Sequence, residues 1–93
     1  METNNNKIKT VRVSRKTDPK QLAISLIYSL DQGLTVKAYS IGEASKILCK
    51  ALAMMNLFQQ GKNIKYDFQP TLEYMKDDTG TIKNVLCWTI NTY

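Results

Sequence analysis

The sequence predicts a two-layer α/β (α+β) domain, a four-stranded mixed sheet with two helices on one face. Two segments in which apolar and polar residues alternate are each followed by a segment of helical periodicity. A long alternating region with a turn in its middle closes the chain, as in a β-hairpin. Because strand–helix–strand crossovers are right-handed, both helices should cover the same face. The expected order is strand, helix, strand, helix, strand, strand.

The first strand–helix unit is predicted within residues 7–33. Residues 7–14 are predicted to form a strand, because apolar and polar side chains alternate from Thr10 onward. Asp18 suits the N-cap of a helix, and Pro19 suits the first helical position. Apolar residues then recur at helical spacing as far as Gly33, which is a natural C-terminal cap. The sequence therefore predicts a helix that begins near Pro19.

The second unit follows directly. Residues 34–40 alternate again and predict a strand, and residues 40–42 form a turn. Residues 43–58 have helical periodicity, with an apolar surface wider than one buried stripe requires. Two interpretations of this surface stay open: deep burial within a small domain, or contact with another subunit.

The last third of the chain predicts a long hairpin. Residues 64–68 alternate, Pro70 interrupts the pattern, and the pattern resumes at residues 72–74. Residues 76–80 (KDDTG) have turn chemistry, and a final strand is expected over residues 81–91. Either face of that strand could point into the core, and the exposed set is a candidate oligomer surface. The competing sets are Val85, Cys87 and Thr89 against Leu86, Trp88 and Ile90.

Five aromatic side chains near or in this hairpin could stack on bases if exposed. Packing in the core or in a dimer contact is the expected use, at least for Phe68 and Trp88, because a one-sided sheet needs such residues inside. Tyr39 alternates with Ala38 on the second strand, so it is a candidate to point outward.

Length and charge limit the class of protein. A chain of 93 residues forms one domain, predicted over residues 7–93, after a polar, disordered tail over residues 1–6. A domain of this size has thin stability, which self-association would raise. Thirteen Lys and Arg against eight Asp and Glu give a net charge of +5. This charge favours an anionic partner such as nucleic acid, although a merely soluble basic protein would fit it as well.

Several classes of function are disfavoured. The chain has no histidine, so imidazole base catalysis and histidine-ligated metals are excluded. Cys49 and Cys87 lie in apolar segments, where reduced cysteine acts as a small hydrophobe. The paired carboxylates Asp77 and Asp78 lie in a turn without a nucleophile beside them. We therefore expect no enzyme, metal, cofactor or small-molecule substrate. Without an apolar leader or membrane span, we expect a cytoplasmic protein without a membrane partner.

Positive charge is concentrated in residues 7–20, where six cations oppose only Asp18. Arg15 and Lys16 directly precede the predicted helix, whose free backbone N–H groups and dipole favour an anion. Two other interpretations stay open: Asp18 already satisfies the helix end, or the cations prevent edge-strand aggregation. Lys46 and Lys50, one helical turn apart, extend the same basic surface or merely solvate their helix.

Residues 13–33 (VSRKTDPKQLAISLIYSLDQG) carry a resemblance to a known family. Their skeleton, Val-Ser-x-Lys-Ser/Thr-x-Pro followed by a Leu/Ala-rich helix ending near Gly, resembles the opening of stage V sporulation protein S, a small relative of the Alba superfamily. The second half continues the resemblance with Ala38 ending a strand, Gly42 opening a helix (IGEASKILCKALA) and a closing hairpin. The resemblance covers about residues 9–91 and rests on the order and spacing of these motifs.

This resemblance implies an Alba-like fold, a homodimer, and binding of DNA or RNA through the loop after the first strand, the turn entering the second helix, and the hairpin tip. The hairpin tip departs from the family pattern, because Asp77 and Asp78 would repel phosphates. We predict a nucleic-acid-binding regulatory protein that contacts the phosphate backbone, with a dimeric protein-interaction module as the alternative. The predicted contact residues are Arg12, Arg15, Lys16, Lys20, Ser40, Gly42, Lys46 and Lys50.

Overall fold

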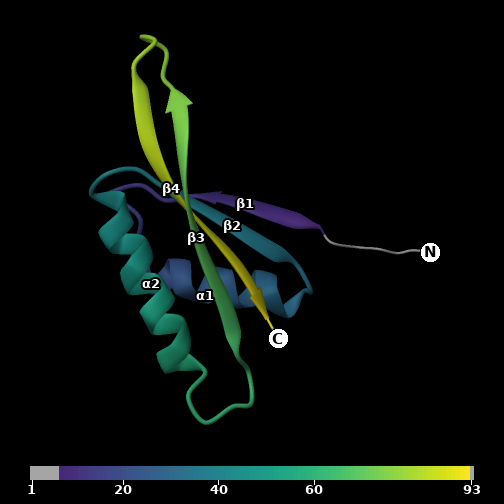
Figure 1. Cartoon of the computed structure of the whole chain (residues 1–93). Coiled ribbons are helices and arrows are strands. Elements are labelled where there is room, and N and C mark those ends of the chain that lie inside the picture. The colour runs from purple at the N-terminus through teal and green to yellow at the C-terminus, as the bar shows by residue number, and fades with distance from the viewer. Residues whose placement is uncertain (1–6, 93) are drawn as a thin grey trace, which may run out of the picture.

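The computed structural model describes residues 7–92 and confirms the predicted element order (Figure 1). The tail predicted for residues 1–6 lies outside the described residues. The elements are β1 (Ile8–Arg12), α1 (Pro19–Asp31), β2 (Thr35–Ser40), α2 (Ala44–Phe58), β3 (Tyr66–Lys76) and β4 (Ile82–Thr92).

The four strands form one mixed sheet in the order β1-β2-β4-β3. β1 runs parallel to β2, and β4 runs antiparallel to both of its neighbours. The last register pair between β2 and β4 is Ser40 with Leu86, whereas β3 and β4 stay paired as far as Lys76 and Ile82. Residues 73–85, here called the hairpin arm, therefore project beyond the rest of the sheet (Figure 1).

Local chemistry sets the limits of α1 as predicted. The Asp18 carboxylate accepts a hydrogen bond from the Lys20 backbone N–H at 3.2 Å, and Pro19 occupies the first helical position. The helix ends where Gly33 adopts a φ of +83°, a left-handed conformation that favours glycine. This cap places Arg15 and Lys16 in the short loop directly ahead of the helix.

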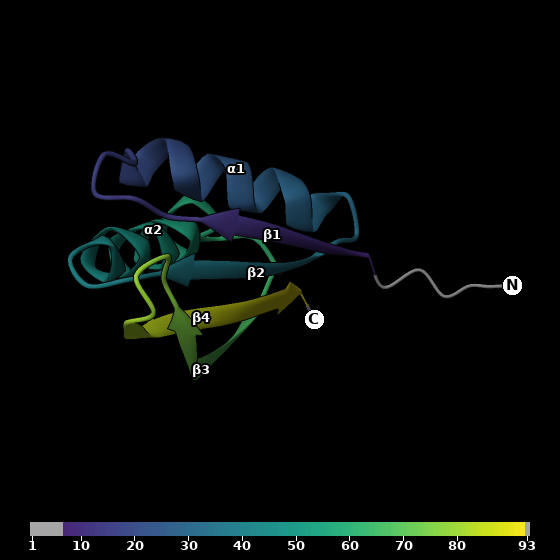
Figure 2. The same ribbon diagram turned by 90° about the horizontal axis from the view of Figure 1, so that it is seen from above.

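Both helices pack on one face of the sheet and share a single core (Figure 2). Leu26 of α1, Leu48 and Met55 of α2, and Val36 and Ile90 of the central strands are fully buried in it. Because β2 and β4 are the central strands, their helix-facing side chains anchor both helices at once.

Pro70, which interrupts the alternating sequence pattern, does not break the strand that contains it. β3 is continuous from Tyr66 to Lys76, and Pro70 is paired in register with Trp88. β3 is an edge strand that pairs only with β4, so alternate backbone groups face away from the sheet and a missing N–H is tolerated there.

Both faces of β4 contain buried residues, which explains why the sequence could not choose between them. Ile90 lies in the core under the helices, whereas Val85 and Cys87 are buried on the opposite face.

The broad apolar surface of α2 is only partly buried. Met55 is fully buried, whereas Leu57 is 62% exposed and Phe58 is 37% exposed.

Candidate functional site

Three segments that are distant in sequence lie at one end of the sheet. β1 and β2 are parallel, so the β1–α1 loop (residues 13–18) and the β2–α2 turn (residues 41–43) both follow the carboxyl ends of neighbouring strands. β4 is antiparallel to β2, so the hairpin arm extends from the same end (Figures 1 and 2). These are the three segments that the sequence resemblance indicated.

The β1–α1 loop is a compact turn held by its own side chains. The Ser14 backbone N–H donates to the Thr17 hydroxyl at 3.0 Å, and the Lys16 backbone N–H donates to the Ser14 hydroxyl at 3.2 Å. The side chains of Arg15 and Lys16 are exposed and form no ion pair within residues 7–92. The turn therefore presents two cations to solvent that no described acidic side chain pairs with.

Arg12 and Lys20 lie on either side of this loop, at the end of β1 and in the first turn of α1. Both side chains are exposed and, like Arg15 and Lys16, form no ion pair among the described residues. The acid nearest in sequence, Asp18, is used as the helix cap. The structure thus places four of the predicted residues around one loop.

The β2–α2 turn holds one of its predicted contact residues, Ser40, inside the fold. The side chain of Ser40 is only 2% exposed, and its hydroxyl is hydrogen-bonded to the Ser45 hydroxyl at 2.9 Å. This contact ties the end of β2 to the first turn of α2. Gly42 lies at the exposed apex of the turn with a φ of +57°. Ser40 therefore has a structural contact here, and its hydroxyl is not presented at the surface.

Lys46 and Lys50 lie on α2, one turn apart and exposed. Lys46 Nζ lies 3.2 Å from a carboxylate oxygen of Glu43, an exposed pair whose attraction is weakened by solvent. Lys50 has no such partner within residues 7–92. The positive charge contributed by α2 is accordingly smaller than that of the β1–α1 loop.

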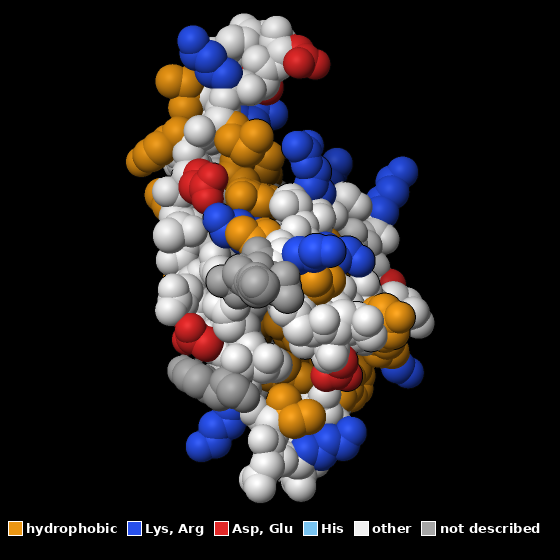
Figure 3. Space-filling model, turned by 90° about the vertical axis from the view of Figure 1, so that its right-hand side faces the viewer, with side chains coloured by type: hydrophobic (Ala, Val, Ile, Leu, Met, Phe, Trp, Pro, Cys, Tyr) orange, Lys and Arg blue, Asp and Glu red, His pale blue; other side chains and the backbone are white. Residues whose placement is uncertain are grey.

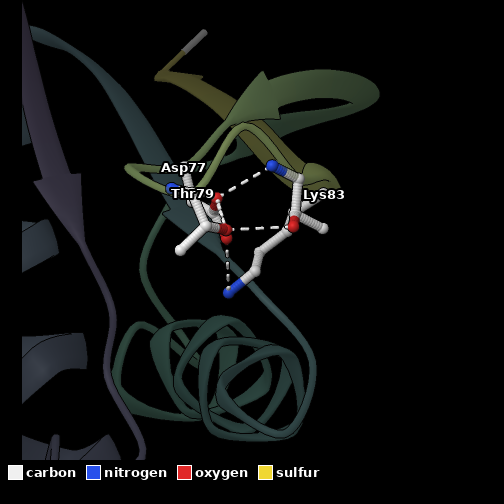
Figure 4. A network of polar contacts seen from close by, with 4 residues as sticks. Asp77, Thr79 and Lys83 are labelled. Atoms are coloured by element: carbon white, nitrogen blue, oxygen red, sulfur yellow. Dashed lines mark hydrogen bonds and ion pairs between the residues drawn. The ribbon is translucent and has the colours of Figure 1, made fainter.

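The hairpin tip is organised by Asp77 (Figure 4). One carboxylate oxygen of Asp77 accepts hydrogen bonds from the Thr79 hydroxyl at 2.6 Å, the Thr79 backbone N–H at 2.9 Å and the Thr81 backbone N–H at 3.0 Å. Lys83 Nζ lies 3.6 Å from the other oxygen. These contacts, led by the hydroxyl of Thr79, lower the pKa of Asp77.

The tip is consequently less acidic toward a ligand than its sequence implied. Asp77 forms the turn and pairs with Lys83, and the same segment also carries the positive charge of Lys76. The turn residues of this segment are consistent with that role, because the side chain of an Asp in a turn commonly accepts a hydrogen bond from the backbone two residues on.

Replacing Asp77 should loosen the tip. Asp77→Ala removes the acceptor of three hydrogen bonds, so we expect a lower midpoint of thermal unfolding and faster amide exchange at Thr79 and Thr81. Because the pKa of Asp77 is lowered by folding, its contribution is complete above the ordinary Asp pKa and is lost as pH falls through the lowered value. Asp78→Ala is the control, and equal effects of the two variants would contradict this role.

A groove with a volume of about 540 Å³ opens between the β1–α1 loop and the hairpin arm. Arg12 is in register with Tyr39, and Val85 is in register with Glu73; all four line the groove. Hydrophobic side chains are visible at the base of the projecting hairpin, close to Lys and Arg side chains (Figure 3). Except for Arg12, sequence reasoning did not assign these residues to a site, because they come together only through the pairing of distant strands.

Tyr39 points away from the helices, as the alternation with Ala38 predicted. Burial, followed by the neighbouring Cys87 thiol and the Glu73 carboxylate, raises the pKa of Tyr39. The phenol is therefore uncharged at neutral pH and can donate a hydrogen bond.

Other chemistry is sparse in the part of the chain that the structure describes. No three His, Cys, Asp or Glu side chains within residues 7–92 lie where they could hold a metal ion together. Cys87 is buried and Cys49, despite its apolar sequence neighbours, is exposed; neither forms a disulfide. No described helix is both long and apolar enough to cross a membrane.

The architecture is that of a known fold. Among solved structures, Alba from Thermoplasma volcanium is similar, with a TM-score of 0.55 and 11% sequence identity over 89% of this chain and 99% of the Alba chain. This similarity shows an Alba-like fold. No protein-family model and no curated protein matches the sequence. The resemblance to stage V sporulation protein S therefore stays a prediction.

Proposed function

We propose that this chain is a non-enzymatic, cytoplasmic regulatory protein that binds the phosphate backbone of DNA or RNA as a homodimer, as the resemblance to stage V sporulation protein S implies. The observation that carries the proposal is the group of exposed cations around the β1–α1 loop, which form no ion pair within residues 7–92 and lie at the end of the sheet from which the hairpin arm projects. Contacts of this kind position a nucleic acid without reading its bases.

The proposed phosphate contacts are ranked by their charge environment. Arg15 and Lys16 contribute most, because they are exposed at the apex of a rigid turn. Arg12 and Lys20 widen the basic surface, and Lys50 extends it along α2. Lys46 contributes only when it leaves Glu43. Gly42 allows close approach of the backbone, and Ser40 supports that turn from inside.

Dimerisation is proposed through the apolar side of α2 and the neighbouring strands. A shallow pocket of about 250 Å³ lies there, with Ala53, Phe68 and Trp88 among its lining residues. The indole N–H of Trp88 is buried and has no hydrogen-bond partner within residues 7–92. Leu57 and Phe58 are exposed on the same helix. A second copy of the chain would cover this apolar surface.

The same apolar surface supports the alternative function, a dimeric module that binds another protein and not nucleic acid.

Both functions are tested by measuring the binding of labelled duplex DNA, single-stranded DNA and RNA at two salt concentrations, together with the molecular mass in solution. Binding by a dimer that weakens steeply with salt supports the proposal, because phosphate contacts release counterions. Absence of binding at low salt would refute it and leave the protein-interaction module.

A further inference from the structure

The groove between the β1–α1 loop and the hairpin arm has walls of different chemistry. Arg12 and Arg15 line it on the side of the β1–α1 loop, and Glu73 and Met75 line it on the side of the arm. Val85, which is 1% exposed, forms part of its apolar lining together with Tyr39. Positive charge, an aromatic ring and a carboxylate thus follow one another across the groove.

The spacing of the strands separates the two charged ends. Arg12 lies on β1 and Glu73 on β3, the two edge strands of the four-stranded sheet. The register sets Arg12 in line with Thr71, and Glu73 lies two residues further along β3. With neighbouring strands about 4.8 Å apart and about 3.4 Å per residue along a strand, the backbones at Arg12 and Glu73 are separated by roughly 16 Å. No ion pair joins them within residues 7–92. The groove therefore contains a cation at one end and a carboxylate at the other, neither of which has an ion-pair partner among the described residues.

This order of groups matches one unpaired nucleotide. We propose that the groove binds a single nucleotide of a single-stranded segment, with its phosphate on Arg12 and Arg15, its base against Tyr39, and an exocyclic amino group of the base donating to Glu73. The inference rests on the proposed nucleic-acid binding and adds its ligand class: single strands whose bases carry amino groups.

Size and chemistry both support this occupant. Ligand pockets commonly have volumes of about 300–1,000 Å³, and the groove, at about 540 Å³, lies within this range. A base inside a duplex could not reach the apolar lining, whereas an unpaired base stacks on aromatic rings and exposes its Watson–Crick edge. A carboxylate accepts a hydrogen bond from the N4 amino group of cytosine and repels the O4 carbonyl of uracil. Glu73 should thus distinguish two pyrimidines of equal size.

The test compares labelled cytidine and uridine RNA octamers, the corresponding DNA octamers and a short duplex, measured by fluorescence anisotropy at low salt. Wild-type protein should bind the cytidine octamer roughly five- to tenfold more tightly than the uridine octamer. Glu73→Gln should abolish this ratio, because an amide can donate to uracil O4 as well as accept from cytosine N4. Equal binding of the two octamers by wild-type protein would overturn the inference.

Tyr39→Leu tests the stacking contact separately. We expect roughly a fivefold or greater loss of affinity for the cytidine octamer and unchanged affinity for the duplex. Tyr74→Leu is the matched control, because Tyr74 is 69% exposed on the hairpin arm and does not line the groove. Equal losses in both variants would overturn the stacking role. Failure of wild-type protein to bind any oligonucleotide would refute the proposed function itself, whereas binding without base preference would refute only this inference.

Discussion

The double variant Arg15→Ala/Lys16→Ala should lose most of the affinity for nucleic acid. Each phosphate contact contributes about one unit to the slope of log K against log salt, so the slope should flatten by about 2 for each protomer that contacts the strand. At low salt we expect the affinity to fall roughly 10- to 100-fold, similarly for all sequences. The measurement is a titration of wild-type and variant proteins over a series of salt concentrations.

A matched control removes the same charge elsewhere. Lys62→Ala/Lys65→Ala also lowers the net charge by two, but these lysines lie in the loop between α2 and β3, at the other end of the molecule from the hairpin tip (Figure 1). We expect this variant to lose little affinity beyond the small effect of net charge. Unchanged affinity of the Arg15/Lys16 variant, or an equal loss in the control, would move the site away from the β1–α1 loop.

Leu26→Ala should strongly destabilise the fold. Leu26 is 1% exposed in the core between α1, α2 and the sheet, and truncation of such a residue costs about 2–5 kcal/mol. For a domain whose free energy of unfolding is about 5–15 kcal/mol, this is a large fraction of the total. We expect a much lower midpoint in urea and thermal unfolding.

The control for this effect lies two residues away on the same helix. Ile24 is 46% exposed, so Ile24→Ala should reduce the free energy of unfolding far less. If both variants unfolded at the same midpoint, the assignment of the buried face of α1 would be wrong.

Much of the fold was predictable because its signals are local. The alternation over residues 34–40, the Asp18–Pro19 start of α1 and the Gly33 end each depend on neighbouring residues, and the structure confirms all three. The continuous path of β3 through Pro70 was not predictable, since it depends on β3 being the edge strand.

The candidate site was predictable only in part, because some of its residues are neighbours in the sequence and others meet only in the folded sheet. The basic residues of the β1–α1 loop follow one another in the sequence, so their charge is evident there. The groove combines Tyr39 with Glu73 and Val85, and these residues meet only after β3 and β4 pair and β4 joins β2. The role of Asp77 was obscured because charge alone made the tip look repulsive, whereas its carboxylate is used within the turn.

The central claim is that nucleic acid binds at the end of the sheet formed by the β1–α1 loop, the β2–α2 turn and the hairpin arm. Its most direct test is a titration of isotopically labelled protein with a short single-stranded RNA at low salt, followed by amide chemical shifts. We predict the largest shift changes at residues 12–17, 41–46 and 73–75, and their reversal by added salt. Changes confined to the loop between α2 and β3, or no changes at all, would contradict it.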